Sequence, residues 1–255
     1  MTFADGEGAG SVLDGLTISG GHNGIHCYAT TPSIRRCRVT ANHGAGLLLQ
    51  GQSDPTLVQC EITANGGPGL EMWAPREGRL VPHNRATIRH CLIAGNGGAG
   101  IHDGRPVISN STIVENRRAG IDTGVVTIAS SIVFFNDQEQ DAVQISGSTA
   151  TVTYSDVQGG WPGDGNIDAD PHFVAPGQWT SVGWIAGDYH LMSAGRRWDA
   201  VSGSWVSDAV TSPCVDAGDP AADLLDELLT IDGLGANQRI NMGAYGGTAE
   251  ASLAP

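Results

Sequence analysis

Three ionisable residues occupy equivalent places in a repeated pattern and could do acid–base chemistry together. Glu71, His102 and Asp122 each follow a glycine and an aliphatic residue, in the triplets GLE, GIH and GID. If the repeats stack as strands about 4.8 Å apart, the two carboxylates are separated by roughly 9 to 10 Å. That separation is at the wide end of the range for the acid and base of an inverting glycosidase. Alternatively, the histidine could abstract a proton from an acidic sugar while a nearby cation stabilises the enolate.

Aromatic and basic residues lie close to this trio in the pattern. Trp73 comes two positions after Glu71, and Tyr28 has the same place two repeats earlier. The longest interval between repeats puts an insertion at residues 74–85. This insertion carries Arg76, Arg79, His83 and Arg85. Long loops of repeat scaffolds often carry function, and an aromatic platform beside arginines suits the binding of an acidic polysaccharide.

The trio also has a simpler interpretation. Glu71, His102 and Asp122 could form a solvated ladder in which the charges screen one another, and cross-strand pairs of this kind contribute only about a few tenths of a kcal/mol. A solvated ladder, a carbohydrate-binding groove and a catalytic site are therefore the three interpretations of this face.

A second set of oxygen-bearing side chains lies in the segment GDGNIDAD. The segment spaces four of these side chains like the first ligands of a calcium loop, at Asp164, Asn166, Asp168 and Asp170. The EF-hand pattern is not met, because alanine stands where its sixth-position glycine and twelfth-position glutamate belong. A looser calcium site is one hypothesis, and aspartates that hydrogen-bond the backbone of their own turn are the other. No other cofactor is indicated.

Short strands in a regular repeat must position these residues. Three apolar columns recur in step, at intervals of 20 to 31 residues. The first column contains Leu13, Ile34, Leu57, Ile88, Ile108, Ile128 and Val152, and the third contains Ile18, Val39, Ile62, Ile93, Ile113, Val133 and Val157. Apolar residues alternate with polar ones in each unit, which predicts strands with one buried face. The sequence therefore predicts an all-β parallel solenoid of about seven coils.

A column of asparagines accompanies the apolar columns, and the second of the apolar columns contains three cysteines. Three residues after the third apolar column come Asn42, Asn65, Asn96, Asn116 and Asn136. Asparagine tolerates left-handed backbone angles and bonds nearby backbone, so we expect an inward ladder at each corner. Cys37, Cys60 and Cys91 share another column, in which parallel side chains suit stacked free thiols better than a disulfide or a zinc site.

Units such as GIHCYATTPSIRRCRVTAN and GLLLQGQSDPTLVQCEITAN resemble the right-handed parallel β-helix repeats of the pectate-lyase-like superfamily. The resemblance covers residues 11 to about 160 and implies an extracellular or cell-surface location. That superfamily contains lyases, hydrolases, epimerases, phage spikes and adhesins, so the fold does not carry the function with it. The catalytic aspartate pairs of polygalacturonases, the calcium ligands of pectate lyases and the DPHD motif of alginate epimerases have no match in this sequence.

The repeat stops after Gly160, and we expect two parts, a β-helix over 1–160 and a module over 161–255 packed on the helix end. The second part carries the motifs GNIDADPHF, GDYHL, SPCVDAGDP and RINMGAYGG, which resemble the choice-of-anchor Q module of secreted bacterial β-helix proteins. A β-helix needs its open end covered. Five of the six tryptophans fall within 161–205, so we expect them, with Cys214, to form an apolar plug.

The composition argues against two classes of binding partner. A net charge of −14 with no lysine argues against nucleic acid and anionic membranes, and no stretch is long enough to span a bilayer. The chain starts without a signal-peptide pattern. Its first coil is uncovered, so self-association through that coil is expected as one mode of assembly.

Two hypotheses about function follow. The first is a secreted or cell-surface β-helix without catalytic activity that binds polysaccharide, self-assembles, or both. The second is a polysaccharide lyase or glycoside hydrolase that acts on an acidic glycan near Trp73. The sequence leaves open whether the protein is an enzyme.

Overall fold

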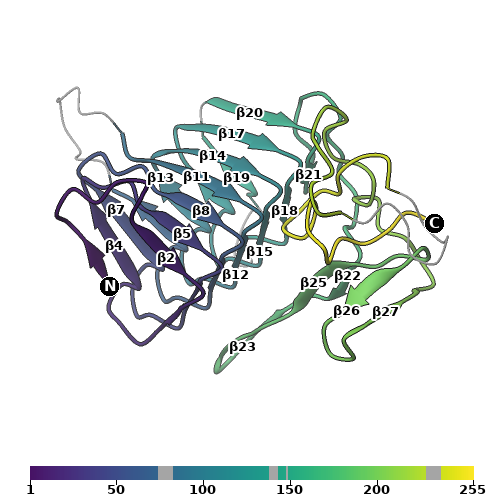
Figure 1. The fold of residues 1–255 in the computed structure, drawn as a ribbon, viewed down its shortest axis with the longest axis horizontal. Helices are drawn as coiled ribbons and strands as arrows, with labels where there is room; N and C mark the ends of the chain where they lie inside the picture. The colour runs from purple at the N-terminus through teal and green to yellow at the C-terminus, as the bar shows by residue number, and fades with distance from the viewer. Residues whose placement is uncertain (74–82, 138–142, 148, 228–236) are drawn as a thin grey trace.

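Three stacked parallel sheets form the body of the protein in the computed structural model, which describes residues 1–73, 83–137, 143–147, 149–227 and 237–255. Each sheet has seven strands, and successive coils contribute one strand to each (Figure 1). The parallel solenoid expected from the repeat is confirmed. Among the described residues, no helix is long and apolar enough to cross a membrane.

The three sheets are named A, B and C. Sheet A contains β1 (Thr2–Phe3), β4 (Ile25–Tyr28), β7 (Leu47–Gln50), β10 (Leu70–Met72), β13 (Ile101–Asp103), β16 (Ile121–Asp122) and β19 (Ile145–Ser146). Sheet B contains β2 (Val12–Asp14), β5 (Ser33–Arg35), β8 (Thr56–Val58), β11 (Arg85–Arg89), β14 (Arg105–Ser109), β17 (Val125–Ala129) and β20 (Thr149–Thr153). Sheet C contains β3 (Thr17–Ile18), β6 (Arg38–Thr40), β9 (Glu61–Thr63), β12 (Leu92–Ala94), β15 (Thr112–Val114), β18 (Ile132–Phe134) and β21 (Asp156–Val157).

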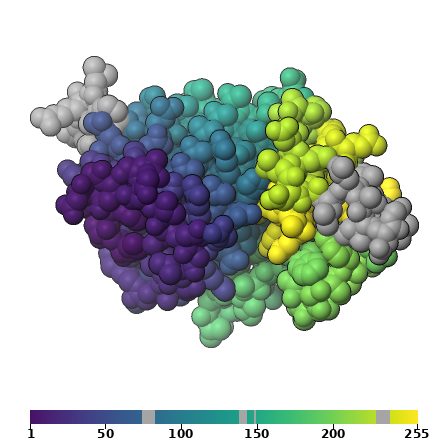
Figure 2. All heavy atoms as spheres, viewed as in Figure 1, coloured from purple at the N-terminus to yellow at the C-terminus, as the bar shows by residue number. Residues whose placement is uncertain are grey.

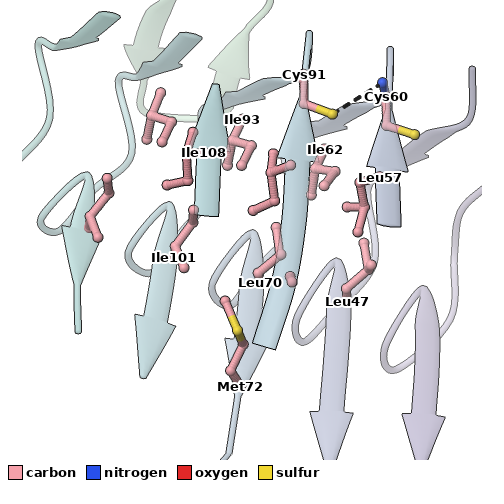
Figure 3. Packing of buried hydrophobic residues seen from close by; sticks show 14 of the residues in the cluster. Leu47, Leu57, Cys60, Ile62, Leu70, Met72, Cys91, Ile93, Ile101 and Ile108 are labelled. Atoms are coloured by element: carbon pink, nitrogen blue, oxygen red, sulfur yellow. Dashed lines mark hydrogen bonds between the residues drawn. The ribbon is translucent and has the colours of Figure 1, made fainter. Parts of the chain in front are cut away.

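The apolar columns stack in register and fill the interior. Ile34 pairs with Leu57, and Leu57 with Ile88, in sheet B. In sheet C, Ile62 pairs with Ile93. These side chains point into one shared core (Figure 3), so every coil buries its apolar residues against the coils on either side.

The last strand of sheet A does not take the register that the spacing of the earlier coils gives. The sequence pattern puts Val143 inward and Gln144 outward, but in the structure Ile145 pairs with Ile121 and Ser146 pairs with Asp122. Gln144 is buried instead, and its Oε1 accepts a hydrogen bond from Asn136 Nδ2 at 2.8 Å. The longer side chain of Gln144 thus takes the place that an asparagine has in the other coils.

The asparagine ladder is confirmed. Each asparagine donates from Nδ2 to the Oδ1 of the next one, at 2.9 Å in every step from Asn42 to Asn136. The left-handed backbone is not on the asparagines of the ladder but on the residues before them, for example Ala41 (φ 53°), Ala64 (φ 54°) and Glu115 (φ 54°). The turn therefore positions the asparagine, whose amide then bonds the coil above and the coil below.

The cysteines are core residues. All five are buried and unpaired. The amide of Cys60 donates to Cys91 Sγ at 3.4 Å (Figure 3), and the amide of Cys91 donates to Ser111 Oγ at 3.2 Å. Burial raises the pKa of the Cys91 thiol well above its usual range, so this group stays protonated and unreactive.

The C-terminal segment contains three two-stranded antiparallel sheets. These pair β22 (Phe173–Ala175) with β25 (Asp188–Leu191), β23 (Gln178–Thr180) with β24 (Gly183–Ile185), and β26 (Arg197–Asp199) with β27 (Ser204–Val206). This segment packs on the outer face of sheet C (Figures 1 and 2). The second core there contains Leu92, Val114, Ile132, Phe134, Phe173, Tyr189, Leu191, Cys214, Val215 and Met242.

We expected residues 161–255 to pack on the helix end; in the structure, part of this segment covers the last coil and part packs on the outer face of sheet C. Trp161 packs against the central core, and Ile167 forms a parallel bridge with Asp156, so residues 161–168 do cover the last coil. The tryptophans do not gather there, however, since Trp198 and Trp205 face each other in the β26–β27 hairpin. From β12 to β18 the outer face of sheet C carries the apolar residues Leu92, Ala94, Val114, Ile132 and Phe134, and burying them decides where the segment lies.

A buried carboxylate fixes the β23–β24 hairpin to sheet C. Glu115 accepts hydrogen bonds from the Tyr189 hydroxyl at 2.6 Å and from Trp184 Nε1 at 3.0 Å, and its carbonyl accepts one from Trp179 Nε1 at 2.7 Å. Burial raises the pKa of Glu115, and the hydrogen bonds from Tyr189 and Trp184 oppose that effect.

Candidate functional site

Glu71, His102 and Asp122 lie side by side on the outer face of sheet A. Glu71 pairs with His102 between β10 and β13, and His102 pairs with Asp122 between β13 and β16. Nδ1 of His102 is 3.0 Å and 3.1 Å from the two carboxylate oxygens of Glu71. Nε2 of the same ring is 3.6 Å from Asp122 Oδ2. The structure therefore brings together the trio that the repeat predicted.

The imidazole of His102 favours its charged form in this setting. Partial burial disfavours the charge, but the hydrogen bond to Glu71 and the negative charges of Glu71, Asp103 and Asp122 outweigh it and raise the pKa of His102 above its ordinary value. The ring thus lies as a cation between two carboxylates over a wider pH range than a free histidine.

A fourth ionisable residue, Asp103, joins the trio and was not predicted from the sequence. Its carboxylate and the ligand atoms of Glu71 and His102 all lie within 4.8 Å of one another. Asp103 has a left-handed backbone, with φ 59°, and Gly104 follows with φ 74°. The Asp-Gly pair in the sequence HDGR is the signal that could have found it, because such pairs favour positive φ.

A groove of about 320 Å³ runs beside the trio. Its walls are Gly66, Gly67, Pro68, Glu71, Gly97, Gly98, Ala99, His102, Arg118 and Asp122. The glycines are required by stacking, since a Cβ on Gly97 would lie 2.4 Å from the carbonyl oxygen of Gly66. Arg118 is exposed and adds a cation to the lining. The groove is therefore lined by backbone and small residues as well as by charged side chains.

Two aromatic side chains lie near this face and are accessible. Trp73 is 49% exposed immediately after β10, and its carbonyl accepts a hydrogen bond from Asn84 Nδ2 at 2.7 Å. Tyr28 is 52% exposed at the end of β4, which lies two strands from β10 in sheet A. Both were expected on this face.

The predicted arginines do not all belong to one loop. Arg76 and Arg79 lie outside the described residues. Arg85 is exposed and begins β11, where it pairs with Arg105 in sheet B. The insertion therefore ends before Arg85, and this residue belongs to a different sheet from the trio.

Glu71, His102 and Asp103 could hold a divalent cation, because a carboxylate–imidazole–carboxylate set provides nitrogen and oxygen ligands. The second predicted metal set is arranged differently. Asn166 ends the column of cysteines and serines, with its Oδ1 accepting from the Ser155 amide at 3.1 Å and its Nδ2 donating to the Val152 carbonyl at 2.9 Å.

The aspartates of that set bind backbone groups. Asp168 accepts a hydrogen bond from the amide of Gly159, and Asp170 accepts one from the amide of His172. The amide of Tyr154 bonds to the main-chain carbonyl of Asp164. A calcium site at these residues stays a prediction.

A family model agrees with this architecture. The family model described as "Right handed beta helix region" matches residues 23–166. Among solved structures, the crystal structure of pectate lyase Pel9A is similar, with a TM-score of 0.49 and 14% sequence identity. The alignment covers 91% of this chain and 64% of that one, so the chain spans less than two thirds of that enzyme. The comparison with curated proteins gave no match.

Proposed function

The chain belongs to the right-handed β-helix family, and on that scaffold we propose that it binds a polysaccharide along the outer face of sheet A without cleaving it. The observation that carries this proposal is that the exposed aromatic residues Tyr28 and Trp73 belong to the same sheet as the groove lined by Glu71, His102 and Asp122. Aromatic rings provide an apolar surface for a sugar face, and the charged groups can bond its hydroxyls.

The spacing of the aromatic residues supports a polymeric ligand. Tyr28 and Trp73 are associated with strands two steps apart in sheet A, which is a separation of about 10 Å along the helix axis. The groove beside Glu71 and Asp122 extends in the same direction, because these residues belong to different coils. A chain of repeating sugar units can contact all these elements together, whereas a small molecule cannot.

The geometry of the trio speaks against a glycosidase. An inverting enzyme leaves room for a water between its acid and its base. Here the ring of His102 fills the space between Glu71 and Asp122. A lyase that used His102 as base would need the neutral imidazole, and the raised pKa of His102 reduces that form near neutral pH.

A polysaccharide lyase or glycoside hydrolase is the second candidate. The observation in its favour is the convergence of three carboxylates on one imidazole, with Asp103 held in a left-handed conformation. Backbone strain of this kind is often found at functional sites.

Binding and turnover on one panel of acidic and neutral polysaccharides separate the two candidates. We expect saturable binding that is weakened about tenfold or more by Trp73→Ala, as for the loss of one buried stacking contact, and retained largely in Trp73→Phe. Val107→Ala, on the outer face of sheet B, is the matched control and should bind as the wild type does. Equal binding by Trp73→Ala and the wild type would contradict the proposed surface.

Turnover is measured as new reducing ends and as unsaturated uronate absorbance. We expect none above background from the wild type. Turnover that is abolished by Glu71→Gln or Asp122→Asn would establish the enzymatic alternative in place of the binding function.

We further propose an extracellular or surface location and assembly through the first coil. A polysaccharide ligand and the resemblance of residues 161–255 to a choice-of-anchor Q module support the location. Val12 and Leu16 support the assembly, because both apolar side chains are about half exposed on the first coil. Cell fractionation and concentration-dependent light scattering test the two points, and a mass that stays monomeric at every concentration would remove the second.

A further inference from the structure

A second pocket, of about 340 Å³, lies where the C-terminal segment meets the β-helix. We call it the junction pocket. The β-helix contributes Arg36, Gln59, Cys60, Glu61, His90 and Leu92, and the C-terminal segment contributes Ala244, Tyr245, Thr248, Ala249 and Glu250. It shares no lining residue with the groove on sheet A.

The charges around the junction pocket are already paired. Arg36 binds Asp14. Arg38 Nε lies 3.4 Å from Glu61 Oε2, and His190 Nε2 lies 3.1 Å from Glu250 Oε2. A ligand therefore does not need a charge of its own to balance the carboxylates of this pocket.

The remaining polar groups include both donors and acceptors. Nδ1 of His90 lies 2.8 Å from the carbonyl oxygen of Gly246, to which it donates in the neutral form, so Nε2 is left as an acceptor. Burial lowers the pKa of His90, which favours that neutral form. Tyr245 stays a protonated phenol, because burial and the nearby Asp188, Glu61 and Glu250 raise its pKa.

The apolar part of the lining is small and rigid. Leu92 and Ala244 belong to the second core. The ring of Tyr245 is held by stacking on His190, with centroids 3.7 Å apart and an angle of 19° between the planes. The pocket thus combines a fixed aromatic ring, short apolar side chains and hydroxyl-binding groups, at the small end of the volumes found for ligand pockets.

We propose that the junction pocket binds one neutral sugar residue of hexose size. The paired charges disfavour an ionic ligand, and the mixed donors and acceptors match a ring of hydroxyl groups. Because the two walls come from residues 36–92 and 244–250, a bound sugar bridges the β-helix and the C-terminal segment. Binding therefore raises the stability of the folded chain by mass action. This inference is independent of the polysaccharide proposal for sheet A.

The test uses the full chain with glucose, galactose and mannose as probes, and with glucosamine and glucuronate as charged counterparts. Protein NMR titration and thermal unfolding are the readouts. We expect saturable shifts at Tyr245, Thr248 and His90 with at least one neutral hexose, and a higher midpoint of unfolding in its presence. Tyr245→Phe, which keeps the stacked ring, should weaken binding about tenfold, as the loss of one hydrogen bond does.

A second variant fills the pocket without touching its paired charges. Ala249→Leu should abolish binding and leave the NMR spectrum of the central β-helix unchanged, whereas Trp73→Ala should bind the hexose as the wild type does. Absence of saturable binding would overturn the proposal. Tighter binding of glucosamine or glucuronate than of the neutral hexoses would overturn the ligand class, and loss of binding in Trp73→Ala would assign the sugar to sheet A instead.

Discussion

Met72 and Asp103 are register partners on adjacent strands of sheet A, yet their side chains lie on opposite sides of the sheet. Met72 is fully buried in the core, whereas the carboxylate of Asp103 lies beside Glu71 and His102 on the outer face. The positive φ of Asp103 and Gly104 produces this reversal. A Cβ on Gly104 would lie 2.5 Å from Met72 Sδ, so the methionine occupies the space that the turn leaves inside.

Replacing Asp103 should separate its backbone role from its charge. We expect Asp103→Ala to lower the free energy of unfolding by about 1 kcal/mol, because alanine is less favourable than aspartate at a left-handed φ. Asp103→Asn keeps a side chain that tolerates this conformation and should cost less. Urea unfolding monitored by circular dichroism provides the comparison. An Asp103→Ala variant as stable as the wild type would show that the turn is not strained.

Substitution of an asparagine at the centre of the ladder should lower the free energy of unfolding more than substitution at the first rung, where Asn42 accepts one hydrogen bond fewer. Asn116 donates to the carbonyls of Ile93 and Val114 and to Asn136, and it accepts two bonds from Asn96. Asn116→Ala leaves several buried groups without partners, so we expect a loss of about 3 kcal/mol or more. The matched control is Asn42→Ala at the first rung. An equal fall of the urea midpoint in the two variants would show that the central rung contributes no more to stability than the first.

The pH dependence of stability should report the charged state of His102. A histidine whose pKa is raised in the folded state stabilises the fold below its unfolded pKa, near 6.5, and this contribution is lost as the pH rises through the folded pKa. The wild type should therefore exceed His102→Gln in stability by more at pH 5.5 than at pH 8.5. Urea unfolding at the two pH values measures the difference, and His26→Gln on the same sheet is the control. A difference that grows with pH would contradict the imidazolium between Glu71 and Asp122.

Asp156 should make stability change with pH in the opposite direction from an ordinary paired carboxylate. Burial raises its pKa from 3.8 to about 6, partly offset by hydrogen bonds from the Cys214 thiol and the amide of Ala169. Between about pH 4 and pH 6 the unfolded chain releases this proton before the folded chain does, so stability falls as the pH rises.

The variant Asp156→Asn has no carboxyl group at this position, so this fall in stability with rising pH should be absent from it. The stability of this variant relative to the wild type should therefore increase between pH 4 and pH 7, by up to about 3 kcal/mol. Thermal unfolding across this range measures it, with Asp168→Asn as an exposed control. A relative stability that does not change with pH would mean that Asp156 titrates as it does in the unfolded chain.

Much of the coil geometry was predictable because it is local. Alternation of apolar and polar residues decides which side chain points inward, and a fixed repeat then stacks equivalent residues, as Leu57 on Ile88 and Glu71 beside His102. The position of Asp103 could not be predicted in this way, because a single left-handed residue reverses the alternation. The inward direction of Gln144 could not be predicted either, because the interval before β19 differs from the earlier ones.

The position of the C-terminal segment left a signal in the sequence that periodicity alone did not reveal. Strands β6 and β9 read RVT and EIT, with an exposed first residue, whereas β12 and β18 read LIA and IVF and are buried on both faces. A strand that is apolar on both faces needs cover on its outer side. The change from one pattern to the other marks where the segment begins to pack.

By itself the sequence determined the stacked coils, the asparagine ladder, the column of free thiols and the alignment of Glu71, His102 and Asp122, since each of these follows from a short pattern repeated along the chain. Only the tertiary structure decided that Asp103 joins that trio, that Phe173 and Tyr189 cover the side of sheet C, and that a pocket opens beside Tyr245. These features depend on contacts between residues far apart in the chain, and on which apolar surface remains uncovered after the coils have stacked.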